Sequence, residues 1–156
     1  MSVSATMQQY MRSKGCEFEV MWHPHTRTSM ETAEAAHIPG DRLAKAVLLS
    51  DTHGYVAVVL PSTYHVGMAE LRARTGRDLS LVPEWELREL FKDCEAGAIP
   101  AACPAYGMET YLDESLAAQP DVYLEGGDHE ALIHMRIDQF LDLMEDATRT
   151  RVGYRM

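Results

Sequence analysis

The residue best placed to do chemistry is a lysine inside an apolar run. Lys45 lies within Arg42–Ser50, which otherwise has the composition of a buried strand. An ammonium group is costly to remove from water, so Lys45 needs an anionic partner, a route to water for its stem, or a ligand. The ordinary alternative is a lysine whose stem packs on the strand while its head reaches solvent. In a dry pocket, this charge could hold a phosphate or stabilise a developing oxyanion.

Two histidines and three cysteines are candidate metal ligands or nucleophiles. His23 and His25 would point the same way on an extended chain, but a metal needs a third ligand and no HExxH-like pair exists, which favours a polar or substrate-facing pair. Cys16, Cys94 and Cys103 are too widely spaced for a disulfide framework or a metal pair. We therefore expect reduced thiols, no metal and no cofactor.

Other catalytic signatures are weak. The sequence has no Gly-x-Ser-x-Gly motif, and the paired acids Glu84 and Glu86 fall on an amphipathic helix, where a solvated face is the simpler interpretation. Cys103 has no recognisable nucleophile signature and is expected to be an inert small residue. Lys45 is therefore the strongest catalytic candidate.

Two loops could carry a ligand. The segment 97–107 is dense in Gly, Pro and Ala, so it is either a plain turn or a loop that lets a ligand approach the backbone. The segment 126–129, Gly-Gly-Asp-His, suits a hairpin turn or a backbone anion nest.

Apolar periodicity predicts helices and strands along the chain. Helices are expected over Ser4–Ser13, over Thr28–Ala36 behind a capping box completed by Glu31, up to Gly76, from Pro83, and after a cap at Asp138. Strands are expected over Glu17–Trp22, Ala44–Ser50, Tyr55–Leu60, Thr110–Leu112, Val122–Glu125 and Ala131–Ile137. We expect the tail, Arg149–Met156, to be frayed.

Two of these strands carry specific expectations. Phe18, Val20 and Trp22 alternate on one face of the first strand, which predicts a half-buried strand. Ala44–Ser50 and Tyr55–Leu60 are separated by a short turn containing Asp and Gly, which predicts an antiparallel hairpin that presents Lys45.

Length and composition limit the classes of protein. With 156 residues and 46% hydrophobic content, residues 1–156 are expected to form a single domain. No run approaches the roughly 18 apolar residues of a membrane span, and no signal pattern opens the chain, so a cytoplasmic location is expected. The net charge of −10 opposes non-specific binding to a polyanion, so a nucleic-acid ligand would need a local basic patch.

Several motifs together resemble the YbaK/EbsC-like family, which includes free-standing aminoacyl-tRNA deacylases and the editing insertion domain of bacterial prolyl-tRNA synthetases. The resemblance rests on segments that occur in the family's order and end near Met135: His25–Ala36, Leu43–Leu49, Val58–Pro61, Gly97–Pro100, Tyr106–Gly107, Asp113–Leu116 and Gly127–His129. It implies an α+β fold with a mixed, mainly antiparallel curved sheet surrounded by helices. It also implies a trans-editing hydrolase that cleaves the ester bond of mischarged aminoacyl-tRNA.

The resemblance implies a site as well. The family's essential lysine falls on Lys45, and the substrate-binding residues would be Thr28, Ser29, Gly97, Ala98, Ile99, Pro100, Ala101, Gly127 and His129. The partners would be the acceptor end of a mischarged tRNA and an aminoacyl-tRNA synthetase. The hydrolytic water would be activated by the substrate's own hydroxyl.

The sequence departs from the family in the loop after Gly97. Ala101 stands where the family's Gly-x-x-x-Pro motif has proline, and Ala102 and Cys103 replace the Phe and Gly that often follow. We expect this change to reshape the aminoacyl pocket and its specificity. The rival interpretation is a non-catalytic tRNA-binding or synthetase-associated module on the same scaffold, which the altered loop and the acidic charge favour.

Overall fold

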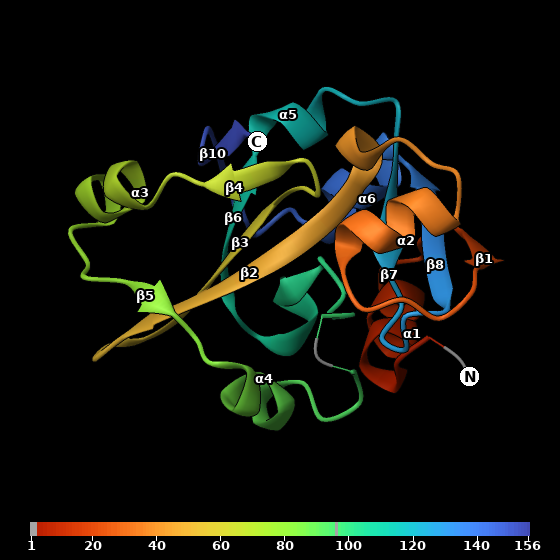
Figure 1. The fold of residues 1–156 in the computed structure, drawn as a ribbon, viewed down its shortest axis with the longest axis horizontal. Helices are drawn as coiled ribbons and strands as arrows, with labels where there is room; N and C mark the ends of the chain where they lie inside the picture. Colours follow the sequence, from red (N-terminus) through yellow and green to blue (C-terminus); the bar gives the residue numbers. More distant parts are fainter. Residues whose placement is uncertain (1–2, 96) are drawn as a thin grey trace.

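A mixed sheet forms the centre of the molecule. The computed structural model describes residues 3–95 and 97–156. Its main sheet runs in the order β1-β8-β7-β2-β3-β6-β9, with β5 beside β2 (Figure 1). The strands are β1 (Glu19–Trp22), β2 (Leu43–Asp51), β3 (Gly54–Pro61), β5 (Ser80–Leu81), β6 (Glu109–Asp113), β7 (Asp121–Glu125), β8 (Ala131–Arg136) and β9 (Thr148–Thr150). Of the pairings within this sheet, four are antiparallel and three are parallel.

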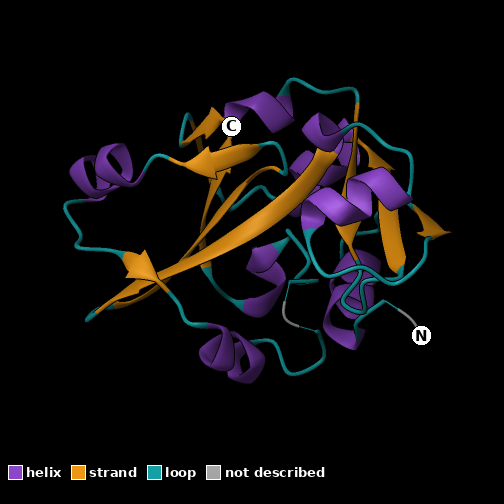
Figure 2. Ribbon diagram, in the orientation of Figure 1, coloured by secondary structure: helices purple, strands orange, loops and turns teal. Residues whose placement is uncertain are grey.

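Helices surround this sheet, as Figure 2 shows. They are α1 (Ala5–Ser13), α2 (Ser29–Ala35), α3 (Met68–Thr75), α4 (Glu84–Leu90), α5 (Glu114–Ala117) and α6 (Ile137–Leu143), with 3-10 turns η1 (Gly40–Arg42) and η2 (Cys103–Tyr106). A small second sheet pairs β4 (Tyr64–Val66) with β10 (Gly153–Arg155). The arrangement confirms the predicted α+β class with a mixed, mainly antiparallel sheet. Within the described residues, no helix is both long and apolar enough to cross a membrane.

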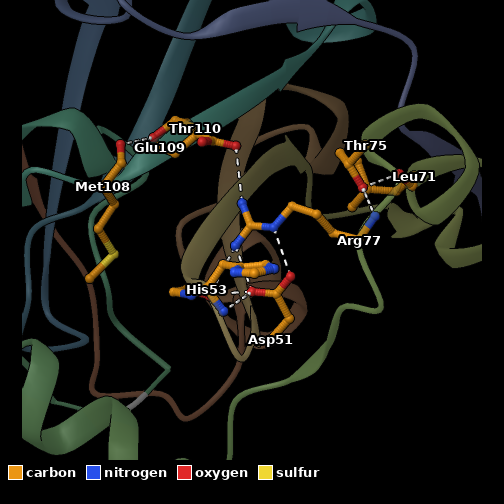
Figure 3. A network of polar contacts seen from close by, with 9 residues as sticks. Asp51, His53, Leu71, Thr75, Arg77, Met108, Glu109 and Thr110 are labelled. Atoms are coloured by element: carbon orange, nitrogen blue, oxygen red, sulfur yellow. Dashed lines mark hydrogen bonds and ion pairs between the residues drawn. The ribbon is translucent and has the colours of Figure 1, made fainter.

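The β2–β3 hairpin forms the long arm of the sheet, and it confirms the predicted turn. Asp51 accepts hydrogen bonds from the backbone of His53 (2.8 Å) and Gly54 (3.1 Å), which closes the turn. Arg77 donates to both carboxylate oxygens of Asp51 (2.7 and 2.8 Å) and reaches Glu109 on β6 at 3.5 Å (Figure 3). The guanidinium holds the pKa of Asp51 well below its usual range. This end of the hairpin is therefore fixed to the rest of the fold.

The sheet splits between β2 and β7. The two strands pair at only two positions, the second being Ala44 with Leu124, and then separate. Ala101 and Ala102 belong to the segment that precedes β6. These buried residues pack in one cluster with Ala44 and Leu124, on one face of the sheet. Because strand residues alternate, Lys45 belongs to the opposite face, beside Leu43.

The first strand is not half-buried in the predicted way. Phe18, Val20 and Trp22 are 40%, 38% and 60% exposed and border an apolar groove of about 680 Å³ beside α1. The better covered residue is Met21, which packs on the other face against Ala33 of α2. The prediction was wrong because β1 is an edge strand whose aromatic face α1 covers only in part.

The C-terminal tail is ordered rather than frayed. β9 extends the main sheet, and β10 pairs with β4. The buried carboxylate of Asp113 accepts hydrogen bonds from the backbone of Val152 (2.8 Å) and Gly153 (3.0 Å). The prediction of a frayed tail was wrong because these long-range contacts have no local sequence signal.

The last helix begins earlier than predicted. Its N-cap is Arg136, and Asp138 lies in the first turn, where it pairs with Arg136 at 3.1 Å. Ile137, expected to end the strand, opens the helix instead. The chain passes directly from β8 into α6, so the last strand residue takes the cap position.

Candidate functional site

A polar cleft of about 410 Å³ lies where the loop before α2, α4 and the turn after β7 meet. It is lined by His25, Thr26, Arg27, Glu84, Arg88, Cys94, Glu95 and His129. The volume is in the range of small-ligand sites, which are usually clefts of roughly 300–1,000 Å³. The cleft can therefore hold a small group such as an aminoacyl ester, and not a macromolecule.

His129 forms the inner wall of this cleft. Its side chain is 3% exposed, and its backbone adopts the left-handed conformation, with φ of 60°. The His25 ring lies edge-on to it, with centroids 5.7 Å apart, and His25 pairs with Glu95 at 2.9 Å. The predicted substrate-facing role of His25 fits this position on the cleft, while His23 is buried and bonds to its neighbour's carbonyl.

Gly97 lies directly against His129. A Cβ at this position would be 2.9 Å from the Arg27 carbonyl oxygen and 3.0 Å from His129 Nε2, and the φ of Gly97 is +85°. Both the close contact and the left-handed backbone require glycine. Gly97 is exposed and lies against His129, which lines the cleft.

The rest of the predicted loop is buried. Ala98 and Ala101 have no exposed surface, and Ile99 and Pro100 are also buried. Their side chains pack into the core, so they do not line the cleft. Ala102 is also fully buried, so its side chain belongs to the core. Ala101 and Ala102 are not among the residues that line this cleft, and the effect of the altered loop on the aminoacyl pocket stays a prediction.

Thr28 and Ser29 lie at the start of α2, with Thr28 as its N-cap. The Thr28 hydroxyl accepts the Glu31 amide (3.2 Å), which confirms the predicted N-cap, and the Glu31 carboxylate accepts the amide of Arg27 (3.0 Å), one residue before that N-cap. The side chains that reach the cleft come from the two preceding residues, Thr26 and Arg27. The resemblance assigns Thr28 and Ser29 to substrate binding, and in the structure these two residues begin α2.

Gly127, predicted to bind substrate, lies in the turn between β7 and β8. It is buried, and a Cβ there would be 3.2 Å from Cys94 Sγ. Its carbonyl accepts the Glu95 amide at 2.7 Å. The Asp128 carboxylate accepts hydrogen bonds from the backbone amides of Glu130 (2.9 Å) and Ala131 (2.8 Å). These two amides of the turn are therefore already satisfied by Asp128. The turn thereby fixes the two cleft residues that flank it, Glu95 and His129.

Lys45 lies at the split in the sheet and outside the residues that line the cleft. It directly follows Ala44, whose register partner is Leu124, so Lys45 and Glu125 come next on the same face where the two strands part. Its Nζ donates to the Ser62 carbonyl at 3.4 Å, and no carboxylate of residues 3–95 and 97–156 forms an ion pair with it. Burial lowers the pKa of Lys45, which reports the cost of removing this charge from water.

Glu125 is a functional candidate that the sequence did not single out. It ends an apolar strand, its side chain is 2% exposed, and its Oε2 lies 3.8 Å from His129 Nδ1. Burial raises its pKa to about 7; Asp128 adds to the rise, while the Thr32 hydroxyl and His25 oppose it. The available signal was an acid that directly follows Val122-Tyr123-Leu124 and precedes two glycines.

The cysteines are poor nucleophiles in this environment. Burial raises the pKa of Cys94, on the cleft wall, to about 12, and likewise that of Cys103 to about 12. Thiolates are the reactive form, so both are protonated and inert near neutral pH. Across the described residues, no group of three or more His, Cys, Asp or Glu side chains is arranged to hold a metal ion.

The structure is an α+β fold with a polar cleft whose wall includes the buried His129, and Lys45 lies half-buried outside that cleft. The chain belongs to the aminoacyl-tRNA editing domain family, whose model matches residues 23–143. No curated protein matches the chain.

Several solved structures share this fold. One, described as "a putative trans-editing enzyme for prolyl tRNA synthetase", has a TM-score of 0.82 at 23% identity, covering 96% of this chain and 95% of that one. The hypothetical protein APE2540 has a TM-score of 0.82 at 20% identity, with 96% and 99% coverage. A structure from a study of epitope grafting onto scaffold proteins has a TM-score of 0.81 at 22% identity, with 97% and 96% coverage.

Proposed function

We propose that residues 1–156 act as one editing domain that hydrolyses the ester bond of mischarged aminoacyl-tRNA in trans. Membership of the editing family supports the editing role. The observation that carries hydrolysis is the half-buried ammonium of Lys45, which has no carboxylate partner among the described residues. An unpaired buried charge is costly, so folded proteins usually pair it with an opposite charge. A charge without such a partner fits a site for an anionic ligand or transition state.

The proposed chemistry needs no enzyme nucleophile. An aminoacyl ester is activated, so positioning and charge stabilisation can supply the rate enhancement. Lys45 would stabilise the developing oxyanion or hold the terminal phosphate, and the aminoacyl group would enter the cleft beside His129 and the Gly97 backbone. The substrate's ribose hydroxyl would activate the water. The protonated state of Cys94 supports this route over thiol attack.

The proposed partner is the acceptor end of tRNA, with an aminoacyl-tRNA synthetase as the source of the mischarged product. Arg27 and Arg88 are exposed at the cleft, and neither forms an ion pair within the described chain. They would supply the local positive charge that an acidic chain needs to approach phosphate. Trp85, 62% exposed and three residues from Arg88 on α4, offers a face on which the terminal base would stack.

The test is a deacylation assay across tRNAs charged with correct and incorrect amino acids, with the enzyme-free rate subtracted. The expected result is hydrolysis of at least one mischarged tRNA by the wild-type protein and its loss in Lys45→Met. Binding of tRNA without hydrolysis of any member of the panel would instead establish the non-catalytic module. The net charge of −10 and the altered loop favour that module, but the unpaired Lys45 is the stronger argument and favours hydrolysis.

A further inference from the structure

Glu125 is a buried carboxyl group that the proposed chemistry has not yet used. Its side chain is 2% exposed, and neither carboxylate oxygen makes a hydrogen bond of normal geometry within the described chain; the Thr32 hydroxyl, close enough to lower the pKa of Glu125, is itself bonded to Thr26 at 2.6 Å. Buried carboxylates are normally paired or hydrogen-bonded, because an unsatisfied one is costly. Asp113, which is also 2% exposed, shows the usual arrangement, with backbone amides and a hydroxyl as donors. Glu125 therefore retains a cost that folding alone does not explain.

The group in front of Glu125 is the imidazole that forms the cleft wall. Glu125 Oε2 lies 3.8 Å from His129 Nδ1, within the range of an ion pair and beyond that of a hydrogen bond. The two residues are fixed by the turn between them, where Asp128 accepts two backbone amides. The opposite side of the ring faces the backbone of Gly97. The carboxyl group thus stands behind the ring, and the cleft lies on its other side.

We propose that Glu125 is a positioning residue of the editing site, which sets the orientation and proton state of His129 through the charge of its carboxylate. The proposal deepens the proposed function and rests on it. An ionised Glu125 favours a proton on Nδ1, as acids behind functional histidines do, whereas a neutral Glu125 exerts no such bias.

The charges around Glu125 allow this change near neutral pH. Burial and the Asp128 carboxylate favour the neutral form, and together they bring the pKa of Glu125 to about 7. The ionised form is favoured by the Thr32 hydroxyl on α2 and by His25 in the preceding loop, itself paired with Glu95. Lys45, on the neighbouring strand β2, lies on the same face of the sheet as Glu125, one position beyond the last pair of β2 and β7. Since the folded-state pKa is raised, the carboxylate is neutral well below pH 7 and charged well above it.

The test compares wild type with Glu125→Gln, which keeps the shape of the side chain and removes its charge. In wild type, the enzyme-dependent deacylation rate should rise through a step with a midpoint near pH 7. Glu125→Gln should lose the step and remain roughly tenfold or more slower at pH 8, while its melting temperature is unchanged or higher. Persistence of the same step in Glu125→Gln would overturn the proposal, as would an equal loss of rate at every pH accompanied by a lower melting temperature.

A second measurement needs no substrate. The ring signals of His129 in NMR spectra, assigned with His129→Gln, should report the ionisation of Glu125, whose pKa is raised to about 7, through a step that Glu125→Gln removes. An unchanged titration of these signals would refute the pairing. If wild type deacylates no tRNA while the signals behave as expected, the proposed function fails and the pairing stands. Asp113→Asn is the matched control, because removing another buried acid should lower stability without moving either midpoint.

Discussion

Replacing Lys45 by methionine should separate activity from stability. Methionine keeps most of the apolar stem and removes the ammonium, which donates a 3.4 Å hydrogen bond to the Ser62 carbonyl. That distance exceeds the usual N–H···O value of about 2.9 Å, so the lost bond is a weak one. The mutation also removes a charge that burial disfavours, as the lowered pKa of Lys45 shows. We therefore expect the free energy of unfolding to change by less than about 1 kcal/mol, because Lys45 forms no ion pair within the described residues that the mutation could break.

Activity should respond much more strongly. A preorganised group that stabilises charge in the transition state is worth about 2.7–4 kcal/mol, which corresponds to a 10²- to 10³-fold loss in kcat. Lys45→Arg should also be impaired, because a planar guanidinium does not replace a compact ammonium in a fitted site. Any stability advantage of Lys45→Met should shrink at alkaline pH. The folded-state pKa of the lysine lies below its ordinary value, so its desolvation cost is present at neutral pH and disappears once the lysine deprotonates.

The assay combines single-turnover deacylation of a mischarged tRNA with thermal melts of each variant. Lys92→Met is the control, since Lys92 is an exposed lysine near the end of α4 and should tolerate the change in both measurements. Rates for Lys45→Met within about twofold of wild type would refute the lysine's role. A large fall in melting temperature would refute the energetic reasoning instead, because it would mean that the ammonium stabilises the fold.

Three further predictions concern the supports of the site. Gly97→Ala should lower both stability and deacylation, because a Cβ would meet the Arg27 carbonyl at 2.9 Å. The control is Gly76→Ala, where φ is similarly positive but no atom lies within 4 Å of the added Cβ. This control should cost only about 1–2 kcal/mol of strain and leave activity intact. Equal effects in melts and rates would show that the close contact is unimportant. Asp113→Ala should cost about 2 kcal/mol or more, since it leaves two buried backbone donors unsatisfied, and should speed hydrogen exchange in β10; unchanged exchange there would contradict the anchoring role. Trp85→Ala should raise KM for mischarged tRNA with little change in kcat, whereas Trp22→Ala, another exposed tryptophan away from the cleft, should not; an unaltered KM in Trp85→Ala would exclude base stacking.

The sequence by itself was sufficient for the elements whose signals are local. The hairpin around Asp51 and the helix N-cap at Thr28 were predicted because each depends on neighbouring residues that satisfy one another's backbone groups. Lys45 could be singled out because an isolated charge in an apolar run is visible in one dimension. The resemblance to editing proteins, carried by ordered motifs, was confirmed by the family match.

Tertiary structure alone decided which of the candidate residues meet. The loop after Gly97 has the composition of a ligand-binding loop, yet Ala101 and Ala102 are buried in one cluster with Ala44 of β2 and Leu124 of β7. Trp22 is exposed because its strand lies at the edge of the sheet. Glu125 gave only a faint signal, since its importance comes from burial and from its distance to His129. Such properties depend on contacts between distant segments, and spacing along the chain does not encode the low dielectric that burial creates.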